Sequence, residues 1–323
     1  MNHADYGRSE TSPPRRIASL LASGTEILYA LGLGSRVVAV SHECDYPPDA
    51  ARKPRVTRSF IAARTSGQID AQVRVLLADG QPLYEVDSAA LAALAPDLIV
   101  TQAQCDVCAV KYEDVLALVE AEPALAETRV VALNPMTLDG IFADILLIAE
   151  ATGRRASGEH YVAELRRRVA AVSAKTVALA PDERPRVAAI EWIDPLMLAA
   201  HWMPGLIELA GARQPLITGG QHSAYNRWEE VVAYDPHVIL VMPCGFDLAR
   251  AAAEADLLRA LPGWETLRAV HDARVFAVDG NAYFNRSGPR IVDSLEILAG
   301  LAHPELFGLP ATFSDGIPVW QRL

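Results

Sequence analysis

The chain has 323 residues, of which 51% are hydrophobic, and a formal net charge of −11 at pH 7. This length gives room for about two domains with cores of their own, and no uncharged apolar run reaches the ~18 residues that suggest a membrane span. The acidic balance disfavours nucleic acid and anionic membrane surfaces as partners, because both are bound through lysine and arginine.

The N-terminal region bears on where the protein resides. Arg15-Arg16 precedes the apolar run Ile17 to Ala22, which superficially matches a twin-arginine export signal. The polar run Ser23 to Glu26 interrupts it, whereas an export signal needs about 7–15 uninterrupted apolar residues. We therefore expect residues 1–14 to be disordered, a first strand to begin at Ile17, and the location to be cytoplasmic. In that reducing compartment cysteines serve as thiols or metal ligands more often than as disulfides.

Residues 15–136 alternate expected strands with expected helices and are assigned to one α/β lobe. The Ser23-x-x-Glu26 spacing matches a capping box, which predicts a helix from Gly24. The expected strands are Ile17–Leu21, Val37–Val40, Leu83–Val86, Asp97–Val100 and Arg129–Leu133, and the expected helices are Gly24–Leu31, Ile69–Ala78, Asp87–Ala95 and Lys111–Glu120.

A long segment without a strand candidate follows. From Thr137 to about Val177 helical periodicity is interrupted only at Gly153 and Gly158, and this pattern predicts one long helical connector, assigned to residues 137–180. Residues 181–323 resume the alternation and form the second lobe. Its expected strands are Val187–Trp192, Leu216–Thr218, Val238–Met242 and Arg274–Val278, and its expected helices are Gly205–Leu209, Trp228–Ala233, Leu248–Leu261 and Gly288–Leu301.

The two halves of the sequence repeat one another. Pro96-Asp97-Leu98-Ile99-Val100 corresponds to the segment Asp235 to Val241, and both expected strands run into turns that contain cysteine. A repeat joined by one helical segment predicts two doubly wound, Rossmann-like lobes. The ligand cleft is then expected between the lobes, at the carboxyl ends of the strands.

The cysteines form a possible metal site. Cys105-x-x-Cys108 has the spacing of a ligand pair, and Cys44 and Cys244 also follow apolar runs. If the strand ends of both lobes converge, the four thiolates could bind zinc or an iron–sulfur cluster. Inert buried thiols and a redox-active pair remain alternatives.

Several motifs together resemble the class III substrate-binding proteins of ABC importers, which bind vitamin B12, siderophores or haem. They are Ser23-x-Thr25-Glu26-Ile27, Ala30-Leu31-Gly32 and Pro96 to Val100, and the resemblance covers about residues 16–303. The combination of His42-Glu43-Cys44-Asp45-Tyr46-Pro47 with Cys105-x-x-Cys108 is similar to a cobalamin-binding branch of that family. The resemblance implies a rigid two-lobed clamp that holds a small tetrapyrrole-like ligand.

The resemblance also concerns a membrane partner. In the importers of that family a surface glutamate on each lobe contacts arginines of the permease. The corresponding first-lobe position is Ala89 or Ala90, while Glu229 or Glu230 could serve on the second lobe. Engagement of a permease, like the oligomeric state, is therefore left open.

A flat macrocycle with amide edges needs aromatic faces and a few hydrogen-bonding groups. Histidine is the ordinary protein ligand for cobalt or haem iron, and His42, His201 and His222 lie in expected loops. Core packing is the competing interpretation for each aromatic residue. The predicted ligand contacts are His42, Glu43, Tyr46, Gln104, Trp192, Trp202, His222, Tyr225, Tyr283, Phe284, Asn285 and Arg286.

Motifs of common enzyme classes are missing from the sequence. It contains no nucleophile elbow, P-loop or Gly-x-Gly-x-x-Gly, and Glu43 and Asp45 are as well placed to pair with Arg286 or Arg290 as to act on a substrate. We therefore predict non-catalytic binding of a corrinoid. The alternative hypothesis is a metal or iron–sulfur protein, possibly enzymatic, that uses the four cysteines.

Overall fold

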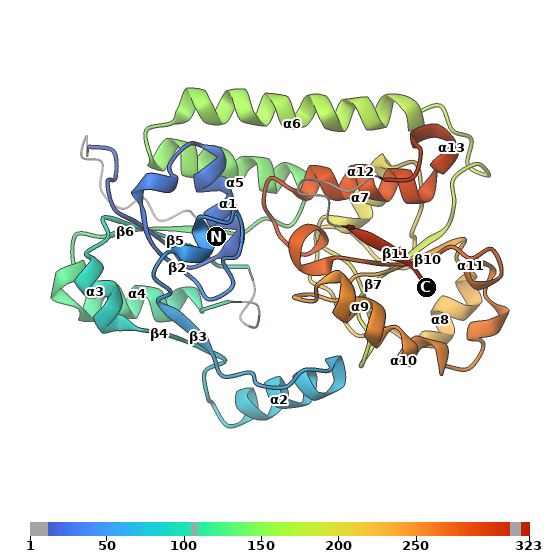
Figure 1. Cartoon of the computed structure of the whole chain (residues 1–323), viewed down its shortest axis with the longest axis horizontal. Helices are drawn as coiled ribbons and strands as arrows, with labels where there is room; N and C mark the ends of the chain where they lie inside the picture. The colour runs from blue at the N-terminus through green and yellow to red at the C-terminus, as the bar shows by residue number, and fades with distance from the viewer. Residues whose placement is uncertain (1–11, 105–106, 108, 311–317) are drawn as a thin grey trace.

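Two α/β lobes lie side by side beneath one long helix, α6 (Arg155–Thr176), as Figure 1 shows. The computed structural model describes residues 12–104, 107, 109–310 and 318–323, and the statements below concern this part of the chain. The predicted two-lobe α/β fold is confirmed. In the described ranges, no helix is both long and apolar enough to cross a membrane.

The first lobe is built on a four-stranded parallel sheet with the order β2-β1-β5-β6. Every residue of the central strands β1 and β5 is buried. Both faces of a parallel sheet are covered, which explains why these strands were recognisable in the sequence as mainly apolar runs. The strand order reverses at β1, and the carboxyl ends of β1 and β5 therefore form a switch point of the kind where α/β sheets bind ligands. The strands are β1 (Ile17–Ser19), β2 (Val37–Val40), β5 (Leu98–Gln102) and β6 (Arg129–Leu133), and the helices are α1 (Ala22–Ala30), α3 (Ser88–Leu94) and α4 (Tyr112–Ala121), with 3₁₀ turns η1 (Gly34–Arg36), η2 (Ala50–Arg52) and η3 (Pro123–Leu125).

Between β2 and β5 the chain leaves this sheet and forms a separate unit, which we call the arm (residues 57–86). Two short antiparallel strands, β3 (Thr57–Ser59) and β4 (Tyr84–Val86), flank helix α2 (Ser66–Ala78). In Figure 1, α2 lies on the side of the molecule opposite α6 and extends beneath the second lobe. The sequence predicted β4 and most of α2. It did not reveal β3, whose three residues are too few to show a period.

The connector consists of two helices, so the prediction of one long helix is wrong in this respect. Helix α5 (Leu138–Ala151) ends before Gly153, which adopts a left-handed φ of 68°, and α6 then runs back along α5. Gly158 does not interrupt α6. It lies where the two helices touch, since a β-carbon at Gly158 would be 2.4 Å from the β-carbon of Ala149.

The second lobe contains a five-stranded sheet with the order β11-β10-β9-β7-β8. Its three middle strands are parallel, and the antiparallel strands β8 and β11 form the edges. The predicted strand Leu216–Thr218 is wrong, because these residues form a turn within a long loop. The strands are β7 (Val187–Trp192), β8 (Met197–Leu198), β9 (Val238–Val241), β10 (Val275–Val278) and β11 (Trp320–Arg322), and the helical segments are α7 (Met203–Leu209), α8 (Trp228–Tyr234), α9 (Leu248–Glu254), α10 (Asp256–Arg259), η4 (Trp264–Thr266), α11 (Arg268–His271), η5 (Gly280–Phe284), α12 (Ile291–Ala302) and α13 (Pro304–Phe307).

The sequence repeat corresponds to a structural repeat. Ala95 and Asp235 each end a helix with a left-handed residue, at φ 40° and 46°, and each precedes a central strand, β5 or β9. The Pro-Asp and Asp-Pro dipeptides therefore mark the same turn from helix to strand in both lobes.

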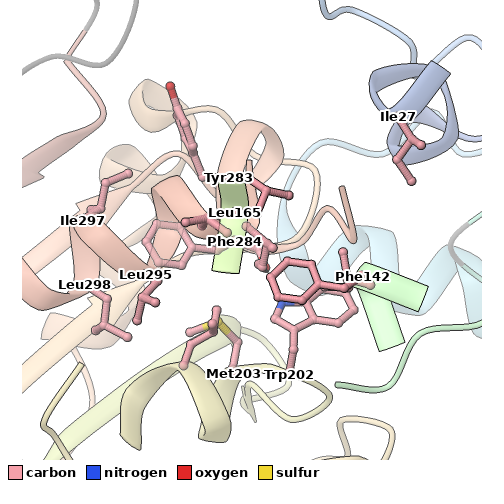
Figure 2. Close-up of a cluster of buried hydrophobic side chains, with 14 of the residues drawn as sticks. Ile27, Phe142, Leu165, Trp202, Met203, Tyr283, Phe284, Leu295, Ile297 and Leu298 are labelled. Atoms are coloured by element: carbon pink, nitrogen blue, oxygen red, sulfur yellow. Dashed lines mark hydrogen bonds between the residues drawn. The ribbon is translucent and has the colours of Figure 1, made fainter. Parts of the chain in front are cut away.

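The lobes share one hydrophobic core. A single cluster of buried side chains includes Ile17 of the first sheet, Phe142 of α5, Leu165 of α6 and Leu295 of α12. Figure 2 shows Trp202 of the second lobe packed beside Phe142, with Ile27 of α1 beyond. Because this core passes through the connector, separating the lobes would expose apolar surface to water.

Candidate functional site

The loops at the carboxyl ends of both sheets meet between the lobes. The loop after β2 contacts the segment after β10, and the residues brought together are Asp45 on one side and Asn281 and Arg286 on the other. This convergence is the arrangement that the sequence analysis required.

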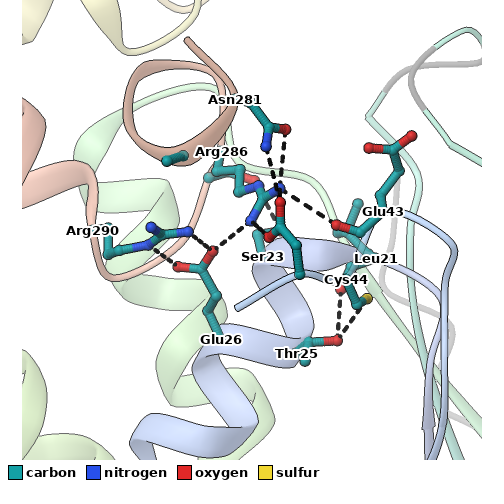
Figure 3. A network of polar contacts seen from close by, with 12 residues as sticks. Leu21, Ser23, Thr25, Glu26, Glu43, Cys44, Asn281, Arg286 and Arg290 are labelled. Carbon is teal, nitrogen blue, oxygen red and sulfur yellow. Dashed lines mark hydrogen bonds and ion pairs between the residues drawn. The ribbon is translucent and has the colours of Figure 1, made fainter. Parts of the chain in front are cut away.

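A four-charge cluster, consisting of Glu26, Asp45, Arg286 and Arg290, joins the lobes (Figure 3). Arg286 donates to Glu26 Oε1 at 3.1 Å and to both carboxylate oxygens of Asp45 at 2.5 and 3.0 Å, and Arg290 donates to Glu26 at 2.6 and 2.9 Å. The side chain of Glu26 is 2% exposed and that of Arg286 is 8% exposed. Two positive charges thus balance two negative charges, and the buried Glu26 is paired with both arginines, whereas Asp45 is 48% exposed.

The electrostatics of the cluster agree with its geometry. Burial by itself raises the pKa of Asp45, but the hydrogen bonds and charge of Arg286 outweigh burial and lower this pKa below its usual value. Burial lowers the pKa of Arg286, whereas Asp45 and Glu26 hold it above its usual range. Pairing of Asp45 with Arg286, one of the alternatives that the sequence left open, is present in the structure, and the same geometry makes Arg286 a link between the lobes.

The predicted capping box at Ser23 and Glu26 is wrong. Helix α1 begins at Ala22, and its N-cap residue Leu21 makes no side-chain hydrogen bond. The carboxylate of Glu26 instead accepts from two arginines of the second lobe. The capping-box rule is based only on residues close in sequence. The Glu26 carboxylate instead pairs with arginines about 260 residues away, and these charged groups take the place of the expected backbone N–H.

Arg290 covers the faces of two predicted aromatic contacts. Its guanidinium carbon lies 4.0 Å from the ring centre of Tyr46 and 5.3 Å from that of Tyr283. Both rings therefore support the cluster through cation–π contacts. The side-chain amide of Asn285 donates to the backbone carbonyl oxygens of Met242 and Gly280. Asn285 therefore stabilises the conformation of the segment that contains it.

His42 and Glu43 lie at the base of the arm. His42 Nδ1 is 2.7 Å from Thr57 Oγ1, and His42 Nε2 is 3.3 Å from the Glu43 carboxylate. The hydrogen bond from His42 is the main reason that the pKa of Glu43 is lowered. The Glu43 side chain is 51% exposed and remains accessible to a ligand. Gln104, half-buried after β5, donates its backbone N–H to the side chain of Gln102.

A pair of histidines lies in the second lobe, where loop 216–226 passes His201. His201 Nε2 and His222 Nδ1 are 3.2 Å apart, and their rings meet edge to face. Burial and the neighbouring His222 lower the pKa of His201 to about 4. The loop is anchored by Ser223, which donates to Glu191 at 2.7 Å.

The same loop lies against the connector at Gly220 and against the arm at Tyr225. A β-carbon at Gly220 would lie 3.8 Å from the Thr137 side chain, and the Tyr225 hydroxyl donates to Asp70 of the arm at 2.6 Å. The exposed residue His222 lies between these two contacts in the chain.

Four of the predicted aromatic contacts are buried in the second lobe, namely Trp192, Trp202, Tyr283 and Phe284. Trp202 is 7% exposed and donates its indole N–H to the carbonyl of Phe284, which is itself fully buried. This packing makes both side chains core residues. Trp192 is 8% exposed and lies edge to face against Phe246, with its indole nitrogen lacking a hydrogen-bond partner.

The four-cysteine hypothesis receives no support from the described residues. Cys105 and Cys108 lie outside them, and within them no group of three His, Cys, Asp or Glu side chains could hold a metal ion. Cys44 is fully buried beside Thr25, and burial raises the pKa of its thiol to about 11. Without a metal, a thiol in this environment stays protonated, as in a structural buried cysteine.

Sequence reasoning missed three site residues, Glu26, Asp70 and Asn281. The capping-box spacing assigns Glu26 to a local cap, and Asp70 lies within the predicted helix Ile69–Ala78 without a signal of its own. Asn281 lies in a polar, glycine-flanked segment, and this composition was the one available signal for its contact with Asp45.

Comparison with known proteins places these features in a family. The sequence model described as "Periplasmic binding protein" matches residues 17–282. A cobalamin-binding protein of Halobacterium salinarum is 26% identical over 296 residues, which cover 90% of this chain and 70% of that protein. A vitamin B12-binding protein of Vibrio cholerae is 54% identical over 44 residues, which cover 14% of this chain and 16% of that protein.

Solved structures show the same fold. The periplasmic vitamin B12-binding protein BtuF of Vibrio cholerae superposes with a TM-score of 0.62 at 23% identity, covering 90% of this chain and 98% of that one.

Proposed function

The chain belongs to the periplasmic binding protein family, and from this premise we propose that it binds a corrinoid of the cobalamin type between its lobes, without catalysis. The observation that carries the proposal is loop 216–226. The ring of Tyr225 in this loop is 56% exposed and its hydroxyl contacts Asp70 of the arm, and the exposed imidazole of His222 lies three residues earlier in the same loop. The two cobalamin-binding relatives support the choice of ligand.

The proposed contacts divide between the two lobes. The first lobe offers the carboxylate of Glu43 and the amide of Gln104, and the second offers His222 and Tyr225. Polar groups of this kind suit the amide edges of a corrin, whereas aromatic rings suit its apolar faces. We leave Trp202, Phe284 and Arg286 out of the set, because the first two belong to the core and the third links the lobes.

We propose that His222 is the residue that coordinates the central metal. Because the lowered pKa of His201 keeps its ring neutral at physiological pH, His201 Nε2 can accept a hydrogen bond from Nδ1–H of His222. His222 then presents the lone pair of its Nε2, and His201 orients the ring as an outer partner, as is usual for metal-ligating histidines.

Haem is the second candidate ligand, and the same histidine pair favours it. A neutral imidazole coordinates haem iron as readily as cobalt. The two ligands are distinguished by direct competition, because both are proposed to be coordinated by the same His222.

The test is titration of purified protein with hydroxocobalamin, cyanocobalamin and haemin, followed by absorption spectroscopy and calorimetry. We expect hydroxocobalamin to be retained through gel filtration with shifted corrin bands. His222→Ala should abolish the shift and weaken binding at least tenfold, while His160→Ala, at an exposed position of α6, should bind as the wild type does. Absence of corrinoid binding with tight haemin binding would select the second ligand, and absence of both would reject the proposal.

A cytoplasmic location is also a proposal. It is supported by the place of the apolar run after Arg15-Arg16 in the fold. Residues 17–19 of this run form the central strand β1. The backbone N–H groups of Arg15 and Arg16 donate to the carboxylate of Asp97. Cleavage within that run would remove a central strand. Fractionation of cells that produce the tagged protein tests the location, and recovery from an extracytoplasmic fraction would contradict it.

A further inference from the structure

The arm connects the lobes a second time, on the face opposite α6 (Figure 1). The backbone N–H of Ser66 donates to Glu254 Oε1 at 2.6 Å, and Tyr225 donates to Asp70. Ile69 packs with the Trp192 and Phe246 cluster of the second lobe. The arm and α6 therefore bridge the two lobes on opposite faces of the molecule.

Two carboxylates of the second lobe hold the first turn of α2. Glu254 accepts from the first helical N–H, and Asp194 packs against Gly67, where a side chain would collide with the carboxylate. The N-terminus of a helix carries a partial positive charge that favours nearby anions. The arm is thus attached by charge and hydrogen bonds more than by apolar packing.

The lobes themselves are poorly suited to separate. They share the continuous core that runs through α5 and α6, and the buried four-charge cluster links them at the strand ends. Opening a hinge between the lobes would expose both. A ligand that enters from solvent therefore needs another moving part.

The arm has the properties of that part. Among the residues of α2 only Ser66 and Asp70 are buried, and Val75 and Leu77 are 59% and 41% exposed. Where the arm meets the second lobe, Ser66 Oγ, Glu254 Oε2 and Trp192 Nε1 are buried and have no hydrogen-bond partner among the described residues. Buried polar atoms without partners disfavour the closed state, because water satisfies them when the contact opens.

We propose that the arm is a gate: it swings away from Asp194, Glu254 and Trp192 to admit the ligand and closes over it, while the lobes stay fixed. This inference rests on the proposed site between the lobes. The ligand enters when α2 loses the contacts of its first turn with the second lobe. The Trp192 side chain is then accessible only in the open state.

A disulfide across the gate tests the proposal. A β-carbon at Gly67 would lie 3.7 Å from the β-carbon of Asp194, within the usual separation for a disulfide. In the Gly67→Cys/Asp194→Cys variant, oxidation should lower the association rate of cyanocobalamin at least tenfold, and dithiothreitol should restore it. The two single-cysteine variants, treated with the same oxidant, are the controls. A cross-linked protein, verified by peptide mass spectrometry, that takes up cyanocobalamin at the rate of the reduced protein would overturn the gate.

A measurement without ligand separates the gate from the identity of the ligand. Amide hydrogen exchange in α2 should be at least 100-fold faster than in the buried helix α12, and the cross-link should slow it. Glu254→Gln should accelerate exchange in α2, whereas Glu229→Gln, an exposed position on α8, should not. Exchange in α2 as slow as in α12 rejects the gate, whatever the ligand. Fast exchange together with absence of tetrapyrrole binding to the wild type rejects only the proposed ligand.

Discussion

Arg286 illustrates how one residue acquires a role from distant partners. Its guanidinium donates to the side-chain oxygen of Asn281, five residues away, and to the carboxylates of Glu26 and Asp45, which lie more than 200 residues away in the chain. Because the group is buried, removing it leaves two carboxylates with fewer partners than their charge requires.

We therefore expect Arg286→Gln to lower the free energy of unfolding by about 2–4 kcal/mol, somewhat less than full loss of a buried pair because Arg290 still contacts Glu26. Urea denaturation followed by circular dichroism measures the change. Arg155→Gln is the matched control, since Arg155 pairs with Glu150 and Glu159 while 73% exposed, and it should leave the urea midpoint close to that of the wild type because solvent screens exposed ion pairs. Equal effects of the two substitutions would argue against a buried link.

Asp144 is a second residue whose environment sets its chemistry. It lies in α5 with 8% exposure, and burial raises its pKa to about 7, although a hydrogen bond from the Asn134 backbone opposes this shift. A carboxyl group with a raised folded-state pKa binds its proton more tightly when folded, so stability falls as pH rises from about 4 to about 7.

Asp144→Asn should remove this penalty. We expect the variant to match the wild type at pH 4 and to exceed it by about 2–4 kcal/mol at pH 8, because one pKa unit corresponds to about 1.4 kcal/mol. Urea denaturation at both pH values measures this. Asp139→Asn, on the same helix with its side chain 86% exposed, should change stability by under about 1 kcal/mol at either pH. A gain at pH 4 as large as at pH 8 would contradict the assignment to ionisation.

At the scale of elements, the connector depends on close contact between α5 and α6. Gly158 permits that contact, because a β-carbon there would lie 2.4 Å from Ala149. Gly205 of α7 differs, since a β-carbon at Gly205 would have no atom within 4 Å. An alanine side chain at position 158 would therefore collide with a neighbouring helix, whereas an alanine side chain at position 205 would meet no other atoms.

Substitution by alanine should separate these cases. Gly158→Ala should lower the free energy of unfolding by about 1–3 kcal/mol through overpacking, while Gly205→Ala should raise it by about 0.5–1 kcal/mol through helix propensity. Thermal and urea denaturation of both variants provide the measurement. Stabilisation of both proteins would show that α5 and α6 tolerate a wider separation.

At the scale of the whole molecule, the shared core predicts that the lobes unfold together. All five tryptophans lie in residues 181–323, so fluorescence reports on the second lobe, whereas far-ultraviolet circular dichroism reports on both. We expect the two signals to give the same urea midpoint, because the core that includes Ile17 also includes Leu295. Two separate midpoints would show that each lobe is stable by itself.

The sequence by itself determined most of the strands, many of the helices, the repeated lobes and the class of protein. These features follow from apolar runs and turn residues that act over a few positions, such as Leu98–Val100 and the Pro-Asp turn before it. The pairing of Asp45 with Arg286 was also foreseen as one of several possibilities, because both residues lie in loops at strand ends.

Only the tertiary structure decided which polar residues link the lobes, which aromatic residues belong to the core, and where the arm docks. Glu26, Trp202 and Asp70 each have a plausible local role in the sequence, yet their partners lie in the other lobe or in the shared core. The physical reason is that charge pairing and burial depend on distance in space. A spacing rule along the chain describes only neighbours within a turn or two.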